Sequence, residues 1–248
     1  MKRLGIILIF VFSIIVNVYF GFQKEGFHED EYYTYFSSNR TMGLYQPDRE
    51  WQDRQTILDE FVVRPGEGFN YGLVKLVQSW DVHPPFYYFV FHTACSLLPG
   101  EFTKWTGITA NLLAFSFTFL VLYLLLERLR VSVWFEAIAL LFYGINPQTI
   151  SSNMLIRMYA WLSLFVALCA YLHVRMVEDT GDESFAGKFF RRHILPIMIV
   201  SYLGFLTQYF YLFFFVSIGV SYAAYVVFWK KNIKRGLLYV SSCAGALY

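Results

Sequence analysis

Charged residues are scarce in this chain: they make up 15% of its 248 residues, while hydrophobic residues make up 57% and aromatic residues 21%. That balance argues against a water-soluble globular protein. The formal net charge is only +2, and no basic stretch is interleaved with aromatics, which excludes a nucleic-acid partner. The three cysteines, Cys95, Cys169 and Cys243, fall in apolar stretches without metal-ligand spacing, so neither a disulfide framework nor a zinc site is indicated.

A cleavage site is also missing near the N-terminus. Met1-Lys2-Arg3 precedes an apolar run over 4–22, which is longer than the core of a signal peptide and is not followed by a small-x-small sequence. We therefore expect a retained first transmembrane helix. No internal repeat or low-complexity segment divides the chain, so residues 1–248 are expected to form a single membrane domain.

The chain contains instead a series of long apolar runs, which predict an all-α polytopic membrane protein. After the first run they cover about 106–126, 134–150, 154–174 and 194–229. The last is far longer than the roughly 20 residues that cross a bilayer, so it is expected to hold two helices with a break near Thr207-Gln208-Tyr209. The prediction is about six transmembrane helices. The apolar segment 237–248 is too short to span and is expected to start a seventh, in a protein truncated at its C-terminus.

The distribution of basic residues predicts the orientation. If the short apolar segment 84–98 does not span, then the basic residues near positions 2–3, 128–130, 175–192 and 230–235 all lie on one side. The positive-inside rule favours this arrangement. It places the protein in the plasma membrane with its N-terminus in the cytoplasm and residues 23–105 in one long external loop. Within that loop we expect interfacial helices over 29–39 and after Pro84, the second capped by Asp81.

Polar side chains in this external region are the candidates for chemistry. Asp30 and Glu31 follow the first helix directly, where a carboxylate beside the bilayer could act as a general base. Asp81 and His83 could orient a substrate hydroxyl or, together with Asp30 and Glu31, contribute to a site for a divalent cation. The alternative is that both acidic groups only stabilise helix N-termini.

Arg157 lies at the external end of an apolar segment, and Tyr159 follows it closely. A guanidinium at that depth is costly unless it reaches the headgroups or meets an anion. Its planar fork of donors matches the oxygens of a lipid phosphate. Snorkelling of the side chain to the headgroups is the competing interpretation.

Three short motifs occur in a fixed order: Asp30-Glu31, then Asp81-x-His83-Pro84-Pro85-Phe86-Tyr87-Tyr88, then Arg157-Met158-Tyr159. Together they resemble the polytopic glycosyltransferases of the GT-C class, in particular the bacterial branch related to protein O-mannosyltransferases and aminoarabinose transferases. The resemblance implies a GT-C-type bundle, a polyprenyl-phosphate-linked sugar as donor, and a lipid, glycan or protein acceptor at the external face. It also implies that Asp30 is the base, that Arg157 binds the lipid phosphate, and that Tyr87 belongs to the substrate-binding element that begins at His83.

Two departures from the family pattern stand out. Relatives often have Ser-Gln-Glu-Ala before Arg-Met-Tyr, whereas this chain has Asn153-Met154-Leu155-Ile156. Many also have a histidine where this chain has Gln208, so no proton transfer can be assigned to that position. The expected reaction is glycosyl transfer with inversion. A transporter or lipid flippase, and an inactive fragment of a glycosyltransferase, are the alternatives.

Overall fold

The computed structural model describes residues 2–41, 49–178 and 186–245, and every regular element in these ranges is a helix. The helices are α1 (Lys2–Gln23), α2 (Glu29–Asn39), α3 (Arg54–Asp59), α4 (Tyr71–Gln78), α5 (Phe86–Ser96), α6 (Lys104–Arg128), α7 (Val133–Ile145), α8 (Pro147–Met154), α9 (Tyr159–Glu178), α10 (Ala186–Phe189), η1 (Phe190–Ile194), α11 (Leu195–Thr207), α12 (Tyr211–Ala224), η2 (Tyr225–Trp229) and α13 (Ile233–Gly245). The elements η1 and η2 are π-helical turns. Residues 246–248 of the predicted seventh segment lie outside the described ranges.

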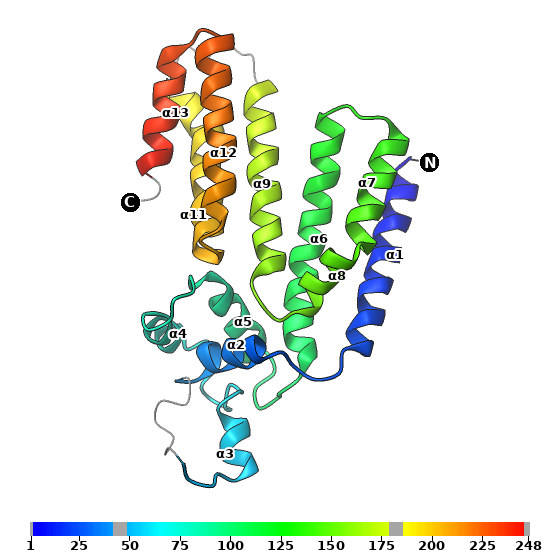
Figure 1. Cartoon of the computed structure of the whole chain (residues 1–248), viewed down its shortest axis with the longest axis vertical. Coiled ribbons are helices and arrows are strands. Elements are labelled where there is room, and N and C mark those ends of the chain that lie inside the picture. Colours follow the sequence, from blue (N-terminus) through cyan, green and yellow to red (C-terminus); the bar gives the residue numbers. More distant parts are fainter. Residues whose placement is uncertain (1, 42–48, 179–185, 246–248) are drawn as a thin grey trace.

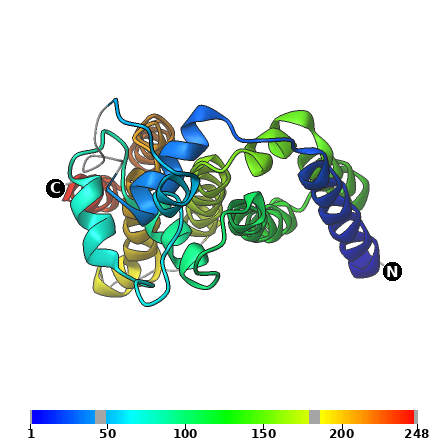
Figure 2. The ribbon, with the colours of Figure 1, turned by 90° about the horizontal axis from the view of Figure 1, so that it is seen from below.

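The long helices form a bundle, and α2 to α5 make a separate helical layer at one of its ends (Figures 1 and 2). Five helices in the described ranges are long and apolar enough to cross a membrane: Arg3–Gln23, Lys104–Arg128, Tyr159–Glu178, Gly187–Thr207 and Tyr211–Trp229. In the bundle α9 packs against α6, α11 and α12, and α1 packs against α7. The chain therefore has the build of a polytopic membrane protein.

The run predicted as one span over 134–150 is two helices in the structure. α7 ends at Ile145, and at 13 residues it is shorter than the roughly 20 that cross a bilayer. Asn146 ends α7 and also caps α8, because its side-chain oxygen accepts the amide of Thr149 at 3.0 Å. Pro147 then occupies the first turn of α8, where its missing N–H costs nothing. By contrast, α11 does end at Thr207, where the sequence predicted a break.

The two ends of the bundle differ in character. Figure 1 places the N-terminus and the α6–α7 and η2–α13 connections at one end, and the α2 to α5 layer with the α8–α9 and α11–α12 connections at the other. Basic residues flank the connections at the first end, among them Arg128, Arg130, Lys230 and Lys231. The acidic and histidine residues singled out above all belong to the second end.

Helix α5 differs from the surface helix that its sequence predicted. It begins at Phe86 with Pro85 at the cap position and has no side-chain cap, so Asp81 does not cap it. Its aromatic residues Tyr87, Tyr88 and Phe91 are at most 1% exposed, because α5 packs against α2, α4, α6 and α11. The helix is a core element of the end layer.

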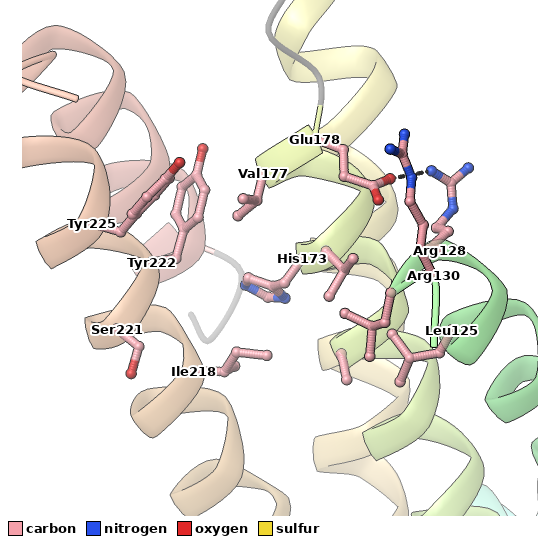
Figure 3. A pocket seen from close by; sticks show the side chains of 13 residues that line it. Leu125, Arg128, Arg130, His173, Val177, Glu178, Ile218, Ser221, Tyr222 and Tyr225 are labelled. Atoms are coloured by element: carbon pink, nitrogen blue, oxygen red, sulfur yellow. Dashed lines mark hydrogen bonds and ion pairs between the residues drawn. The ribbon is translucent and has the colours of Figure 1, made fainter. Parts of the chain in front are cut away.

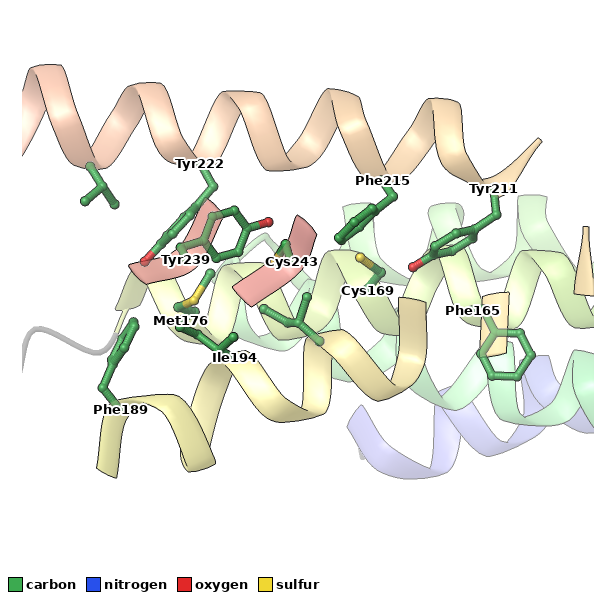
Figure 4. Close-up of a cluster of buried hydrophobic side chains, with 12 residues drawn as sticks. Phe165, Cys169, Met176, Phe189, Ile194, Tyr211, Phe215, Tyr222, Tyr239 and Cys243 are labelled. Carbon is green, nitrogen blue, oxygen red and sulfur yellow. The ribbon is translucent and has the colours of Figure 1, made fainter. Parts of the chain in front are cut away.

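A groove of about 890 Å³ opens between α6 and α12, over α9 (Figure 3). The largest cluster of buried hydrophobic side chains joins α9, α11, α12 and α13 (Figure 4). A second cluster joins the end layer to the α8–α9 connection and consists of Tyr35, Phe61, Val63, Tyr87, Phe91, Cys95, Ile156 and Met158.

Candidate functional site

The α8–α9 connection, residues 155–158, carries Arg157 into the end layer. Its backbone is held from two sides. The Nδ2 atom of Asn111 on α6 donates to the carbonyl of Leu155 at 2.7 Å, and the amide of Ile156 donates to Oε1 of Glu31 at 2.7 Å. Ile156 is fully buried against Gly107, where an added Cβ would lie only 2.2 Å from its Cγ2 atom. These contacts fix the direction in which the Arg157 side chain leaves the connection.

The Arg157 side chain is only 3% exposed, and its contacts are with neutral groups. Nη1 donates to the carbonyl of Asp30 at 3.3 Å, to Oη of Tyr88 at 3.4 Å and to Oγ1 of Thr34 at 3.5 Å. Nε is buried and has no hydrogen-bond partner among the described residues. Within the described part of the chain, no carboxylate lies within 4 Å of this guanidinium. Its positive charge is therefore available to an anion.

Asp81 and His83 form a chain of contacts that ends at Arg157. The Nδ1 atom of His83 lies 3.0 Å from Oδ1 of Asp81, and its Nε2 atom lies 3.1 Å from Nη2 of Arg157. A guanidinium can only donate, so Nε2 must be the acceptor and His83 is neutral in this arrangement. Its proton sits on Nδ1 and is donated to Asp81. Asp81 thus selects the His83 tautomer whose Nε2 atom accepts the hydrogen bond from Arg157.

Asp30 and Glu31 are neighbours in sequence with opposite environments. The Glu31 side chain is 0% exposed, and Oε2 forms an ion pair with Nζ of Lys24 at 2.9 Å and accepts the amide of His28 at 2.6 Å. Its other oxygen, Oε1, accepts the amide of Ile156, so both oxygens are engaged. Glu31 therefore holds the α8–α9 connection in position. The Asp30 side chain is 47% exposed. Of these two carboxylates, only that of Asp30 is accessible to a ligand.

The two tyrosines that follow Phe86 also differ. Tyr87, predicted to bind substrate, is fully buried in the hydrophobic cluster of the end layer, and in the described part of the chain its hydroxyl has no hydrogen-bond partner. Tyr88 contacts Arg157, and burial raises the pKa of its hydroxyl, which the nearby Arg157 opposes. Tyr88 therefore stays protonated. The sequence motif contained both residues, and only the helix rotation of α5 distinguishes them.

Tyr159 is 37% exposed at the start of α9, two residues beyond Arg157. Thr34, a full turn after Asp30 on α2, completes the surroundings of the guanidinium and was not singled out from the sequence. The structure thus brings Asp30, Asp81, His83, Tyr88 and Arg157 together from four separate segments. The Arg157 guanidinium is suited to holding an anion, and Asp30 contributes its backbone carbonyl to this group while its side chain stays exposed.

The residues considered for a divalent cation do not gather into a metal site. Among the residues that the structure describes, no three His, Cys, Asp or Glu side chains are placed to hold a metal ion. Glu31 is engaged with Lys24 and backbone amides, and Nε2 of His83 faces a cation, Arg157.

In comparisons with protein-family models, curated proteins and solved structures, nothing matches this chain.

Proposed function

We propose that this protein transfers a sugar from a polyprenyl-phosphate donor to an acceptor hydroxyl, with inversion at the anomeric carbon. The single observation that carries the proposal is the buried Arg157 guanidinium, which has no carboxylate partner among the described residues and donates to the backbone carbonyl of Asp30, a residue whose side chain is 47% exposed. The Arg157 guanidinium can bind a phosphate, and the Asp30 carboxylate can accept a hydroxyl proton. Transfer from a lipid-linked sugar phosphate to an acceptor hydroxyl requires both groups at one membrane surface.

In the proposed reaction the acceptor oxygen forms a bond to the anomeric carbon while the bond from that carbon to the phosphate oxygen breaks. Asp30 takes the hydroxyl proton, and polyprenyl phosphate leaves with the bonding electron pair. Arg157 offsets the charge that develops on the phosphate. Such preorganised charge is most effective where water is excluded, and Arg157 is 3% exposed.

The remaining polar residues position these two groups. His83 accepts a hydrogen bond from Nη2 of Arg157 and donates one to Asp81, so the guanidinium keeps one orientation. Tyr88 and Thr34 contact Nη1. In this proposal Tyr159, which is 37% exposed at the start of α9, contacts the sugar or the lipid.

The orientation that we propose puts the end layer outside the plasma membrane and the N-terminus in the cytoplasm. It is supported by the basic residues that flank the connections at the opposite end of the bundle (Figure 1). The donor then enters from the outer leaflet, and the lipid, glycan or protein acceptor approaches from outside. A flippase would more naturally place its charged residues along the middle of the spans.

The test is transfer in proteoliposomes supplied with a panel of radiolabelled polyprenyl-phosphate sugars and membrane extracts as acceptors. Asp30→Asn should lower the rate at least about 100-fold, because a general base contributes that much or more. Glu29→Gln, which removes an exposed carboxylate from the preceding position, is the matched control and should keep the wild-type rate. Full activity of a normally folded Asp30→Asn variant contradicts the proposal. So does the absence of transfer from every donor in the panel.

A further inference from the structure

A second site lies at the end of the bundle opposite Arg157. The groove of about 890 Å³ has α9 as its floor, the C-terminal part of α6 as one wall, and α12 with η2 as the other (Figure 3). Its volume falls within the roughly 300–1,000 Å³ typical of ligand sites. All three helices have the length and apolarity of membrane spans, so the groove is open to the position that lipid chains would occupy.

The groove is lined mainly by hydrocarbon. Ala170, Val174 and Val177 form the floor, and Leu125 and Ile218 face each other from the two walls. Val177 is 38% exposed, and Leu129 at the edge of the groove is 51% exposed. Such a surface fits an alkyl chain better than a polar ligand.

Packing behind the groove keeps it in shape. Cys169 and Met176 of α9 and Tyr222 of α12 belong to the largest buried cluster, which fixes α9 against α11, α12 and α13 (Figure 4). His173 in the floor is held at both ring nitrogens, by the carbonyl of Cys169 at 2.8 Å and by Oη of Tyr239 at 2.7 Å. The groove is therefore preformed.

Cationic side chains lie close to both walls of the groove. Arg128 is neutralised by Glu178 at 2.6 Å, and Figure 3 shows Arg130 beside this pair. On the other wall Nζ of Lys230 lies 5.6 Å from the ring centre of Tyr225, which lines the groove. Neither Arg130 nor Lys230 has a carboxylate within 4 Å among the described residues. The apolar groove thus has Arg130 in its lining and Lys230 next to Tyr225 of the opposite wall, both without a carboxylate partner among the described residues.

We infer that this groove binds an anionic phospholipid, with one acyl chain along α9 and the phosphate between Arg130 and Lys230. The charge of these two side chains matches a phosphate, and the apolar lining matches the chain. In the proposed orientation this end of the bundle meets the cytoplasmic leaflet, where anionic lipids attract basic residues near the surface. The inference depends on the helices spanning a membrane and does not depend on the transfer reaction.

The test uses the full chain purified in detergent and titrated, by native mass spectrometry, with phosphatidylglycerol and with phosphatidylcholine of the same acyl chains. Phosphatidylglycerol should bind at least about fivefold more tightly. The double variant Arg130→Gln/Lys230→Gln should lose that preference. Lys234→Gln, which removes an exposed cation at the same end but outside the groove, should keep it.

A second pair of variants tests the groove itself. Ser221→Phe places a ring on the α12 wall and should weaken phosphatidylglycerol binding, whereas Val220→Phe, on an outward position that is 63% exposed, should not. Equal binding of the two lipids overturns the inference. It is also overturned if the Ser221→Phe protein binds normally, or if glycerol 3-phosphate alone competes as well as the lipid.

Discussion

Arg157 and His83 lie 74 residues apart in the sequence, yet Nη2 of the first is 3.1 Å from Nε2 of the second. The contact requires a neutral imidazole whose single proton points to Asp81. A buried guanidinium is thereby held by a neutral acceptor, and its charge remains available to a ligand. Several consequences of this arrangement can be measured.

The first prediction concerns the acceptor that His83 provides. His83→Ala removes it and should lower kcat/KM for the polyprenyl-phosphate donor about 10-fold or more, since a hydrogen bond to a charged group contributes about 1.5–3 kcal/mol. His83→Gln can place an amide oxygen near the Nε2 position and should recover most of the loss. Steady-state kinetics with the donor varied provide the measurement. Equal losses in the two variants would argue against the acceptor role.

Adjacent tyrosines should respond differently to loss of the hydroxyl. Tyr88→Phe removes a contact of Nη1 of Arg157 and should reduce transfer several-fold, because a typical hydrogen bond contributes about 1 kcal/mol. Tyr87→Phe removes a buried hydroxyl for which the described residues offer no hydrogen-bond partner, so activity and stability should be unchanged or slightly improved. Parallel rate and thermal unfolding measurements on the two variants check this. A larger effect at Tyr87 would reverse the assignment.

Glu31 is expected to act through stability. Glu31→Gln leaves Lys24 without its ion-pair partner and should destabilise the end layer by about 3 kcal/mol, the cost of removing one member of a buried pair. Glu29→Gln, on the exposed side of the same helix, should shift the unfolding midpoint little. The readout is thermal unfolding in detergent. A Glu31→Gln protein of wild-type stability that has lost all transfer would instead indicate direct participation in the chemistry.

Close packing of α6 on the Arg157 connection can be tested at Gly107. The three atoms nearest to a Cβ at this position all belong to Ile156, so Gly107→Ala should cost about 1–3 kcal/mol through overpacking. Adding Ile156→Ala should relieve the clash, and the double variant should be more stable than the sum of the two single changes indicates. Gly5→Ala, with nothing within 4 Å of the added atom, is the control. Strict additivity of the two changes would rule out the contact.

Stability should also depend on pH through His92 in the end layer. Burial lowers the pKa of this histidine from its ordinary value of 6.5, and a hydrogen bond to the Ser38 backbone opposes the shift only in part. The unfolded chain therefore binds the proton more readily, so stability is greatest above about pH 6.5 and falls as the pH drops below that value. Unfolding midpoints between pH 5 and 8 should show this slope. The slope should be smaller in a His92→Gln variant.

Much of the helical framework follows from the sequence because long apolar runs can satisfy their backbone groups only as helices in a membrane. That logic located α1, α6, α9, α11 and α12, and the short helix predicted over 29–39 is α2. It missed the break at Asn146, although Asn146-Pro147 is a local signal for the start of a new helix. It also did not anticipate the late start of α9 at Tyr159.

At the site, the sequence by itself determined which residues carry charge or a titratable ring at this end of the bundle: Asp30, Glu31, Asp81, His83 and Arg157. Only the tertiary structure decided which of them are buried and which are accessible. The contact between Glu31 and Ile156, for example, spans 125 residues and depends on packing of the end layer. That packing buries Glu31, leaves Asp30 accessible and turns Tyr88, not Tyr87, toward the guanidinium. Local patterns set helix positions, whereas rotation and burial are set by what each helix meets.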